Sequence, residues 1–271
     1  MKYYFVNPLV KLSALFALII MVSSCQKEEL ATEEPVAAQS LGDAENLMDD
    51  ANDEATYRTA PDYSGTDCPV ITYANPQGTF PNTITLDFGD GCEGRNGRIK
   101  SGQIIVEISA PYDTEGSVRS ITPVNFFVND WQIEGQRTVT NMGYDENGFM
   151  HWNVVVENAK VTNPDGEFAT WNANRTRTLI EGGDTETCED NVYEITGGST
   201  GISRKGVAFT ATITTPLIKP MSCRWPVSGV REVTADGGTG FRIYDMGDGT
   251  CDNKATVTFA NGTVKEITLR R

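Results

Sequence analysis

The best candidates for a chemical role are the closely spaced carboxylates in two copies of an acidic turn motif, Asp-x-Gly-Asp-Gly. The two copies occupy residues 87–91 and 245–249. Their carboxylates at Asp87, Asp90, Asp245 and Asp248 could offer calcium the hard oxygen ligands it prefers. Neither copy has the closing Glu of an EF-hand loop, and Asp-Gly is also a common turn pair. We expect structural turns, and we keep the four aspartates as weak metal candidates.

Aromatic and basic side chains form a second arrangement with chemical potential. In the stretch 171–178, Trp171 is followed by Arg175 and Arg177 on a predicted strand. Residues two apart on a strand share a face, so the two arginines could bind an anionic glycan or a partner carboxylate. A cross-strand ion pair with nearby acids is the alternative. All four tryptophans could form a sugar-stacking face, or they could fill the core. They are Trp131, Trp152, Trp171 and Trp225.

Hydrolytic machinery has little support in the sequence. His151 is the only histidine, which excludes multi-histidine metal sites, and its alternating surroundings favour an exposed or edge position on a strand. The chain has no Gly-x-Ser-x-Gly elbow, phosphate loop or dinucleotide fingerprint. We expect no catalytic residue and no cofactor. A glycoside hydrolase or other hydrolase with unidentified paired carboxylates is an alternative, because such a pair need not be close in sequence.

The cysteines suggest two similar Cys-strand-turn-Cys units. Cys68 leads through a strand to the first acidic turn and Cys92, and Cys223 leads through strands to the second turn and Cys251. We predict the disulfides Cys68–Cys92 and Cys223–Cys251, which leave Cys188 free or intermolecular. Crossed pairing stays open, because sequence cannot fix connectivity.

The N-terminal residues look like a bacterial lipoprotein signal. An apolar run from Leu12 leads into Val22-Ser23-Ser24-Cys25, a small-residue site that closes on a cysteine. The apolar stretch is shorter than the roughly 20 residues of a spanning helix, so we expect residues 1–24 to be removed as a signal peptide. We expect Cys25 to carry the lipid, including palmitate-type acyl chains, which would hold the mature chain at a membrane. The sequence Lys27-Glu28-Glu29 resembles a surface-export signal, which favours the cell surface over the periplasmic face.

Residues 25–67 are predicted to form an acidic, disordered tether. Twelve acidic residues face two basic ones between positions 26 and 67, in a chain with a net charge of −15. Such a segment lacks the apolar clusters that would offset the entropy of ordering, apart from a possible helical turn around 41–48. The remaining chain has no basic cluster, which disfavours nucleic acid as a partner.

The region 68–271 reads as one all-β domain. Short alternating or β-branched runs recur between Asn-Gly and Asp-Gly turn pairs, and no long window shows a helical period. We expect an antiparallel meander that closes as a β-sandwich or a strongly curled sheet, and we expect disulfides to brace it. The predicted strands are 70–73, 83–88, 103–109, 124–128, 152–156, 208–214, 255–259 and 264–269.

Several segments together resemble secreted Bacteroidota lipoproteins of unassigned function. The resemblance rests on the lipobox at 22–25, on Cys223-Arg224-Trp225 and on Gly249-Thr250-Cys251-Asp252-Asn253. It implies a β-rich fold and an envelope location, and it implies no activity. The sequence therefore predicts a lipoprotein anchored in the outer membrane that acts as a non-catalytic binding or structural module. A glycan or a protein is the expected partner, and a glycan-binding lipoprotein is the sharper alternative.

Overall fold

The fold is known from a computed structural model of the chain. The structure describes residues 48, 51, 68–94, 97–185, 189–235 and 240–269, which all lie within one compact unit, Ala37–Arg271. Cys25, the predicted signal peptide and Cys188 lie outside the described residues. None of the helical residues that the structure describes belongs to a segment long and apolar enough to cross a membrane.

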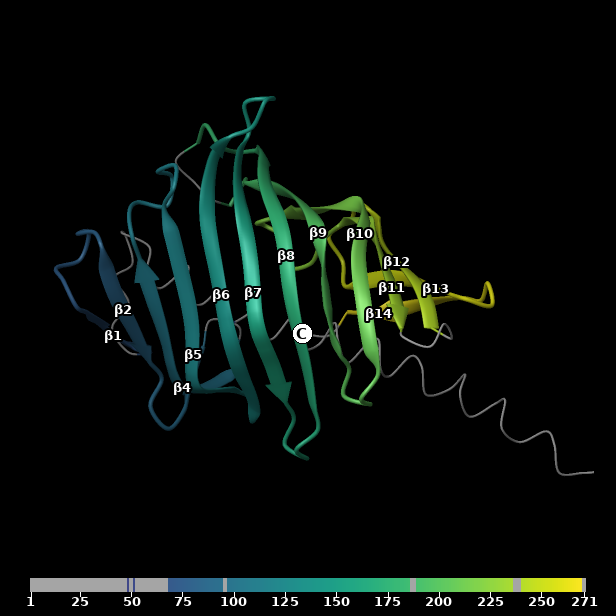
Figure 1. Ribbon diagram of the computed structural model, residues 1–271, viewed down its shortest axis with the longest axis horizontal. Coiled ribbons are helices and arrows are strands. Elements are labelled where there is room, and N and C mark those ends of the chain that lie inside the picture. Colours follow the sequence, from purple (N-terminus) through teal and green to yellow (C-terminus); the bar gives the residue numbers. More distant parts are fainter. Residues whose placement is uncertain are drawn as a thin grey trace, which may run out of the picture. The chain divides into compact units, whose positions relative to one another are not determined.

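The described chain forms a single 14-stranded antiparallel sheet, which confirms the all-β prediction (Figure 1). Each strand lies beside strands that are close to it in sequence, and the short β3 pairs with β4 at the end of the β2 ladder. The strands are β1 (Val70–Tyr73), β2 (Asn82–Asp87), β3 (Cys92–Glu93), β4 (Ile99–Ile108), β5 (Val118–Val128), β6 (Trp131–Tyr144), β7 (Met150–Thr162), β8 (Phe168–Glu181), β9 (Val192–Ile202), β10 (Ala208–Pro220), β11 (Ser228–Ala235), β12 (Gly240–Asp248), β13 (Lys254–Phe259) and β14 (Val264–Thr268).

The sheet curls but is not closed, and it is a single sheet, so the predicted β-sandwich is wrong and the curled sheet is the form that the described chain takes (Figure 1). Irregular positions inside the long strands explain the curl. Register shifts interrupt the β4–β5, β5–β6, β6–β7 and β7–β8 ladders. Gly102, Asn125, Gly135 and Asn158 lie at these shifts, and all four have a positive φ. An extra residue in one strand increases the local twist and bends the sheet. Gly102 must be glycine, because a Cβ there would lie 1.9 Å from the carbonyl oxygen of Asn125.

The hydrophobic core lies against the inner, concave face of this sheet. It is built from alternating apolar residues of β2, β4, β5, β6, β7, β8, β10, β11, β12 and β13, as a sheet with one buried face requires. Met48 and Ala51 also belong to the core. They are helical and only 3% and 0% exposed, although both fall within the segment predicted as a disordered tether. Their apolar side chains are buried in spite of the acidic residues around them.

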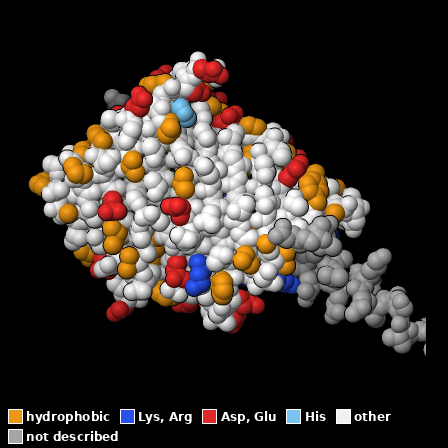
Figure 2. All heavy atoms as spheres, viewed as in Figure 1, with side chains coloured by type: hydrophobic (Ala, Val, Ile, Leu, Met, Phe, Trp, Pro, Cys, Tyr) orange, Lys and Arg blue, Asp and Glu red, His pale blue; other side chains and the backbone are white. Residues whose placement is uncertain are grey.

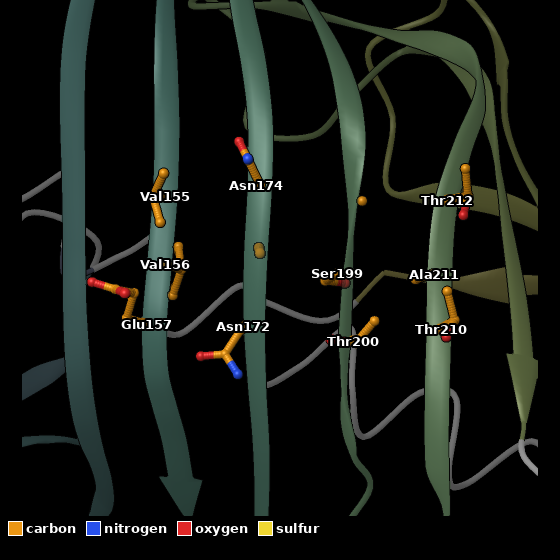
Figure 3. A pocket seen from close by; sticks show the side chains of 12 residues that line it. Val155, Val156, Glu157, Asn172, Asn174, Ser199, Thr200, Thr210, Ala211 and Thr212 are labelled. Atoms are coloured by element: carbon orange, nitrogen blue, oxygen red, sulfur yellow. The ribbon is translucent and has the colours of Figure 1, made fainter.

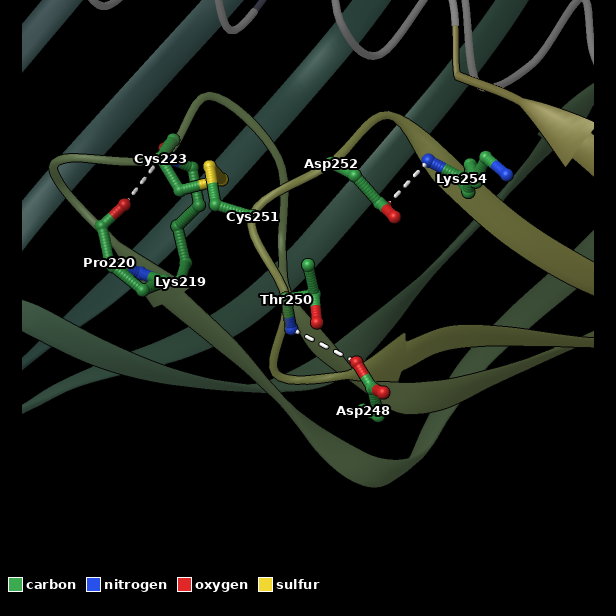
Figure 4. Close-up of a disulfide and its surroundings, with 8 residues drawn as sticks. All are labelled: Lys219, Pro220, Cys223, Asp248, Thr250, Cys251, Asp252 and Lys254. Carbon is green, nitrogen blue, oxygen red and sulfur yellow. Dashed lines mark hydrogen bonds between the residues drawn. A yellow bond between two sulfur atoms is a disulfide. The ribbon is translucent and has the colours of Figure 1, made fainter.

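Both predicted disulfides are present, at opposite ends of the meander. The first, Cys68–Cys92, links the segment just before β1 with strand β3. The second, Cys223–Cys251, links the β10–β11 turn with the segment before β13 (Figure 4). The chain separations are 24 and 28 residues. Around the second disulfide, the Lys219 ammonium donates hydrogen bonds to the carbonyl oxygens of Pro220 and Cys223. Each disulfide therefore closes a local loop and braces one end of the sheet.

Candidate functional site

Strand β8 places Trp171, Arg175 and Arg177 on one face of the sheet, and this face is the inner one. In the β7–β8 ladder, Arg175 pairs with Val154 and Arg177 pairs with Trp152. Trp171 is 3% exposed and packs in the core, so its ring is not available to stack on a ligand. The two arginines are partly buried. The structure thus brings these three predicted residues to a common face without making it an open surface.

The tryptophans do not form an exposed sugar-stacking platform. Trp152 is 2% exposed and, like Trp171, is part of a hydrophobic cluster. Trp131 and Trp225 are half-buried, and each lies beneath an arginine. The core interpretation therefore fits these positions better than the platform interpretation.

Five side chains on the inner face form a stacked column, which we call the aromatic–arginine cluster: Arg119, Tyr112, Trp152, Tyr193 and Arg177. The rings of Tyr112 and Trp152 stack with centroids 5.1 Å apart, and Tyr193 meets Trp152 edge-on at 6.1 Å. Arg119 lies 5.2 Å from the Tyr112 centroid at one end, and Arg177 lies 3.5 Å from the Tyr193 centroid at the other. Cation–π attraction of this kind is stronger where the groups are desolvated.

Hydrogen bonds hold the loop that carries Tyr112 against the sheet. The Asn141 amide, on β6, donates to the Tyr112 carbonyl oxygen at 3.0 Å, and its Oδ1 accepts from the Gly143 N–H at 2.7 Å. Burial raises the pKa of the Tyr112 hydroxyl, and burial also lowers the pKa of the Arg119 guanidinium. The sequence could not identify this cluster, because its members come from four strands and a loop spread over 82 positions from 112 to 193.

Three of the four candidate aspartates in the acidic turn motifs accept backbone hydrogen bonds within their turns, as turn caps, and the fourth, Asp90, is exposed. Asp87 accepts a hydrogen bond from the Gly89 N–H at 2.8 Å and another from the Gln103 amide at 2.8 Å, and these bonds lower the pKa of its carboxyl. Asp245 accepts from the Gly247 N–H, and Asp248 accepts from the Thr250 N–H (Figure 4). The hydrogen bonds from Thr250 likewise lower the pKa of Asp248.

These caps bear on the possible metal site. A carboxylate that satisfies its own backbone in an Asx turn has fewer lone pairs to offer a cation. Within the described ranges, no group of three or more His, Cys, Asp or Glu side chains is placed to hold a metal ion. His151 lies on β7, in the interior of the sheet order, and its Nδ1 is 3.1 Å from the Gly143 carbonyl oxygen. It is half-buried on a central strand, where the sequence predicted an exposed or edge position.

A shallow depression lies on the opposite, outer face of β7–β10 (Figure 3). Its volume is about 490 Å³. Val155, Asn174, Gly198 and Thr212 are successive cross-strand partners through its centre. The floor is low at Gly198 because this position has no side chain, and a Cβ there would lie 2.5 Å from the Ala211 carbonyl oxygen.

The rim of the depression carries amides, hydroxyls and one carboxylate. Asn172, Asn174, Thr200 and Thr210 rise from three neighbouring strands and are exposed, with Glu157 on the β7 side (Figure 3). The surrounding outer face is mostly uncharged and carries scattered acidic side chains (Figure 2). Asn and Thr side chains each donate and accept hydrogen bonds, so this surface suits a polar, neutral ligand. The sequence signal for it was the run of alternating Thr and Asn residues, which also fits a plain solvent-facing strand.

The comparisons with known proteins define no class for this chain. It matches no protein-family model, no curated protein and no solved structure. Functional inference therefore rests on the fold and on the two surfaces described above.

Proposed function

We propose that the protein is a lipid-anchored outer-membrane protein that binds a glycan, without catalysis, on the outer face of its sheet. The observation that carries the binding proposal is the depression of β7–β10, with exposed amide and hydroxyl groups on a largely neutral face. The anchor proposal rests on the lipobox that ends at Cys25.

The hydrogen-bonding chemistry favours a glycan among polar ligands. Sugar hydroxyls act as both donors and acceptors, and Asn174, Thr200 and Thr210 can match both roles. The Asn172 Oδ1 accepts from the Asn158 N–H at 2.8 Å, so Asn172 would serve a sugar chiefly as a donor through its Nδ2. An anionic ligand would meet Glu157 with no basic residue among the lining side chains, and a cation would find only that one carboxylate. A neutral polysaccharide fits this set better than either.

The shape of the site sets the expected affinity. The depression is shallow and contains no aromatic ring, so a sugar would gain few apolar contacts there. We expect a dissociation constant on the order of 1 mM for one site. Many copies held on one membrane would raise the apparent affinity for a polymer with repeated units. The single lining carboxylate, Glu157, does not provide the pair that glycoside hydrolysis uses.

The binding test compares the wild-type protein with the variant Asn172→Ala/Asn174→Ala on an array of neutral and acidic polysaccharides. We expect retention on a neutral polysaccharide that falls at least about tenfold in the variant, a loss of about 1.4 kcal/mol. Asn153→Ala is the matched control, because Asn153 is an amide on the same outer face of β7 outside the depression. The glycan proposal would be refuted if the wild-type protein were retained on no polysaccharide, or if the double variant were retained as well as the Asn153→Ala control.

The anchor test uses Cys25→Ala in the full-length precursor. We expect the wild-type chain to incorporate a labelled fatty acid and to sediment with the outer membrane, and the variant to do neither. Protease treatment of intact cells then distinguishes the two membrane faces, since only a surface-displayed chain is cleaved. A wild-type chain that carries no fatty acid contradicts the lipoprotein assignment.

A further inference from the structure

Beside the depression, the outer face of the sheet carries two exposed apolar side chains, Phe168 on β8 and Ile202 on β9. Phe168, Thr170 and Asn172 alternate along β8 and therefore share the outer face. Ile202 is the cross-strand partner of Thr170, so it is a diagonal neighbour of Phe168, and such neighbours lie about 7–8 Å apart. The two side chains are 51% and 48% exposed. Together they form a small apolar surface next to the amides and hydroxyls of the depression.

This apolar pair lies within reach of the depression along the strands. Asn172 lines the depression and lies about 13 Å from Phe168 along β8, at about 3.3 Å per residue. Thr200, which also lines it, is on the same face of β9 as Ile202. A single sugar ring is too short to touch both Phe168 and Asn172. A glycan of several units that lies along β8 can contact both.

Two sets of contacts hold the Phe168 ring in place. The β7–β8 turn that precedes it is closed by hydrogen bonds from the Asn163 N–H to the Glu167 carbonyl oxygen at 2.9 Å and from the Glu167 N–H to the Asn163 Oδ1 at 2.8 Å. From β7, the Lys160 Nζ lies 5.2 Å from the centroid of the Phe168 ring. A ring that is already positioned loses little side-chain entropy when a ligand packs on it.

Lys160 and Glu134 supply hydrogen-bonding groups next to the ring. Glu134, Lys160 and Thr170 are successive cross-strand partners on β6, β7 and β8. The Lys160 Nζ lies 3.0 Å from the Glu134 Oε2, and the two side chains are 37% and 43% exposed. An ammonium and a carboxylate each offer more hydrogen-bonding positions than this one contact uses, so both can also bind hydroxyls. Figure 2 shows apolar side chains beside a basic and an acidic group at this end of the face, where β7 ends and β8 begins.

We propose that Phe168, Ile202, Lys160 and Glu134 form a second subsite for a glycan, which we call the stacking subsite. The apolar face of one pyranose ring packs on Phe168 and Ile202, and hydroxyls at its edge bind Lys160 and Glu134. The glycan then runs along β8, with its next units in the depression. This inference rests on the proposed glycan function and narrows it, because the ligand must be an oligomer or polymer of neutral pyranoses that lies parallel to the strands.

Replacing the ring tests the stacking subsite. Phe168→Ala and the control Phe149→Ala are compared with wild type on the neutral polysaccharide that retains the protein. Phe149 is a matched control, because it is 40% exposed and precedes β7, at the opposite end of that strand. We expect the dissociation constant to rise about tenfold in Phe168→Ala, the effect of losing about 55 Å² of apolar contact. The control should bind as wild type does.

Two conservative variants separate stacking from an effect on the fold. Phe168→Tyr keeps the ring and should bind within about twofold of wild type, whereas Phe168→Leu keeps apolar bulk without the ring and should bind at least about threefold more weakly. Phe168 is half exposed, so we expect all three variants to keep the far-UV circular dichroism spectrum of wild type. Equal binding by the Tyr and Leu variants would contradict the stacking subsite, whatever the behaviour of the Ala variant.

Fragments of the same polysaccharide test the direction of the chain. We expect the affinity of wild type to rise once a fragment is long enough to span both Asn172 and Phe168, and we expect this rise to be absent in Phe168→Ala. A wild-type affinity that does not depend on fragment length would overturn the inference.

The outcomes distinguish this inference from the proposed function. If the wild-type protein is retained on no polysaccharide, the glycan function and the stacking subsite are both refuted. If Asn172→Ala/Asn174→Ala loses retention and Phe168→Ala does not, the depression binds the glycan and the stacking subsite is wrong. Equal losses in Phe168→Ala and Phe149→Ala would also overturn the stacking subsite, because the effect would then not depend on the position of the ring.

Discussion

Replacing Trp152 with alanine tests the aromatic–arginine cluster most severely. The indole is 2% exposed, stacks on Tyr112 and meets Tyr193 edge-on. A tryptophan buries about 150–250 Å², which corresponds to roughly 4–6 kcal/mol at about 25 cal/mol per Å². That figure is an upper estimate because unfolded chains already bury some apolar surface, and measured Trp→Ala losses in cores are about 3–5 kcal/mol. We expect Trp152→Ala to reduce the free energy of unfolding by about 4 kcal/mol.

Urea unfolding followed by far-UV circular dichroism measures this loss, and a thermal scan should show a fall in Tm of about 8–16 °C for a domain of this size.

A double-mutant cycle then isolates the ring contact. We expect Trp152→Ala and Tyr112→Ala to couple by about 0.5–1.5 kcal/mol, the range for stacked aromatic pairs. Val257→Ala replaces Tyr112→Ala in a control cycle, because Val257 is as buried as Trp152 but packs in the other hydrophobic cluster. Its coupling to Trp152→Ala should stay below about 0.5 kcal/mol. A loss below about 2 kcal/mol for Trp152→Ala would refute the packing described for this face.

Three further predictions concern the disulfides, the turn caps and the outer face. Cys223→Ala/Cys251→Ala should cost about 3.6 kcal/mol in urea unfolding, from the entropy of a 28-residue loop, and an unchanged midpoint would show that the bridge adds no stability. The pKa of Asp145 is lowered chiefly by the hydrogen bond from the Phe149 N–H, so its stabilising effect is present above the unfolded value of 3.8 and is lost as pH falls through the lower folded pKa. Asp145→Asn should therefore be less stable than wild type at pH 7, and the difference should shrink as pH falls below 3.8; a difference that stays constant as pH falls would contradict that reasoning. Gly198→Ala should lower the free energy of unfolding by about 1–3 kcal/mol, because the new Cβ would lie 2.5 Å from the Ala211 carbonyl oxygen. Gly183→Ala is the control and should change stability by less than about 0.5 kcal/mol, because its Cβ would meet only the movable side chain of Leu179 at 3.0 Å. Equal effects in the two variants would count against the close approach of β9 and β10.

The sequence predicted strands where apolar residues alternate or cluster, and it missed strands whose outer face is rich in threonine, asparagine and glycine. β9 is the clearest case. Its stretch Thr196-Gly197-Gly198-Ser199 has no large apolar residue and reads as a loop, yet the strand is held by neighbours on both sides. β6 was also missed, because Gly135 and its bulge interrupt the alternation. Local patterns cannot show that a weak strand lies between two strong ones.

The curl of the sheet and the burial of Met48 and Ala51 were likewise beyond the reach of local sequence patterns. Whether the meander forms a sandwich or a curled sheet depends on where bulges fall in adjacent strands, and no single strand carries that information. Met48 and Ala51 looked like isolated apolar residues in an acidic segment, and only the shape of the inner face gives them a place in the core. The disulfide pairing was predictable because each pair flanks a hairpin-like unit that is local in sequence.

The strictly sequential strand order gives the two disulfides a role beyond loop closure. In a meander, every inner strand has two partners, and the strands at the two margins have one, so thermal opening begins at the margins and moves inward. Cys68–Cys92 spans the first margin, and Cys223–Cys251 spans β11 and β12, so that only β13 and β14 lie beyond it. The sheet is thus fastened near both ends, and the strands β5–β10, which carry the aromatic–arginine cluster and the outer depression, are insulated from fraying. A chain displayed outside the cell, with no chaperone to refold it, would benefit most from this arrangement.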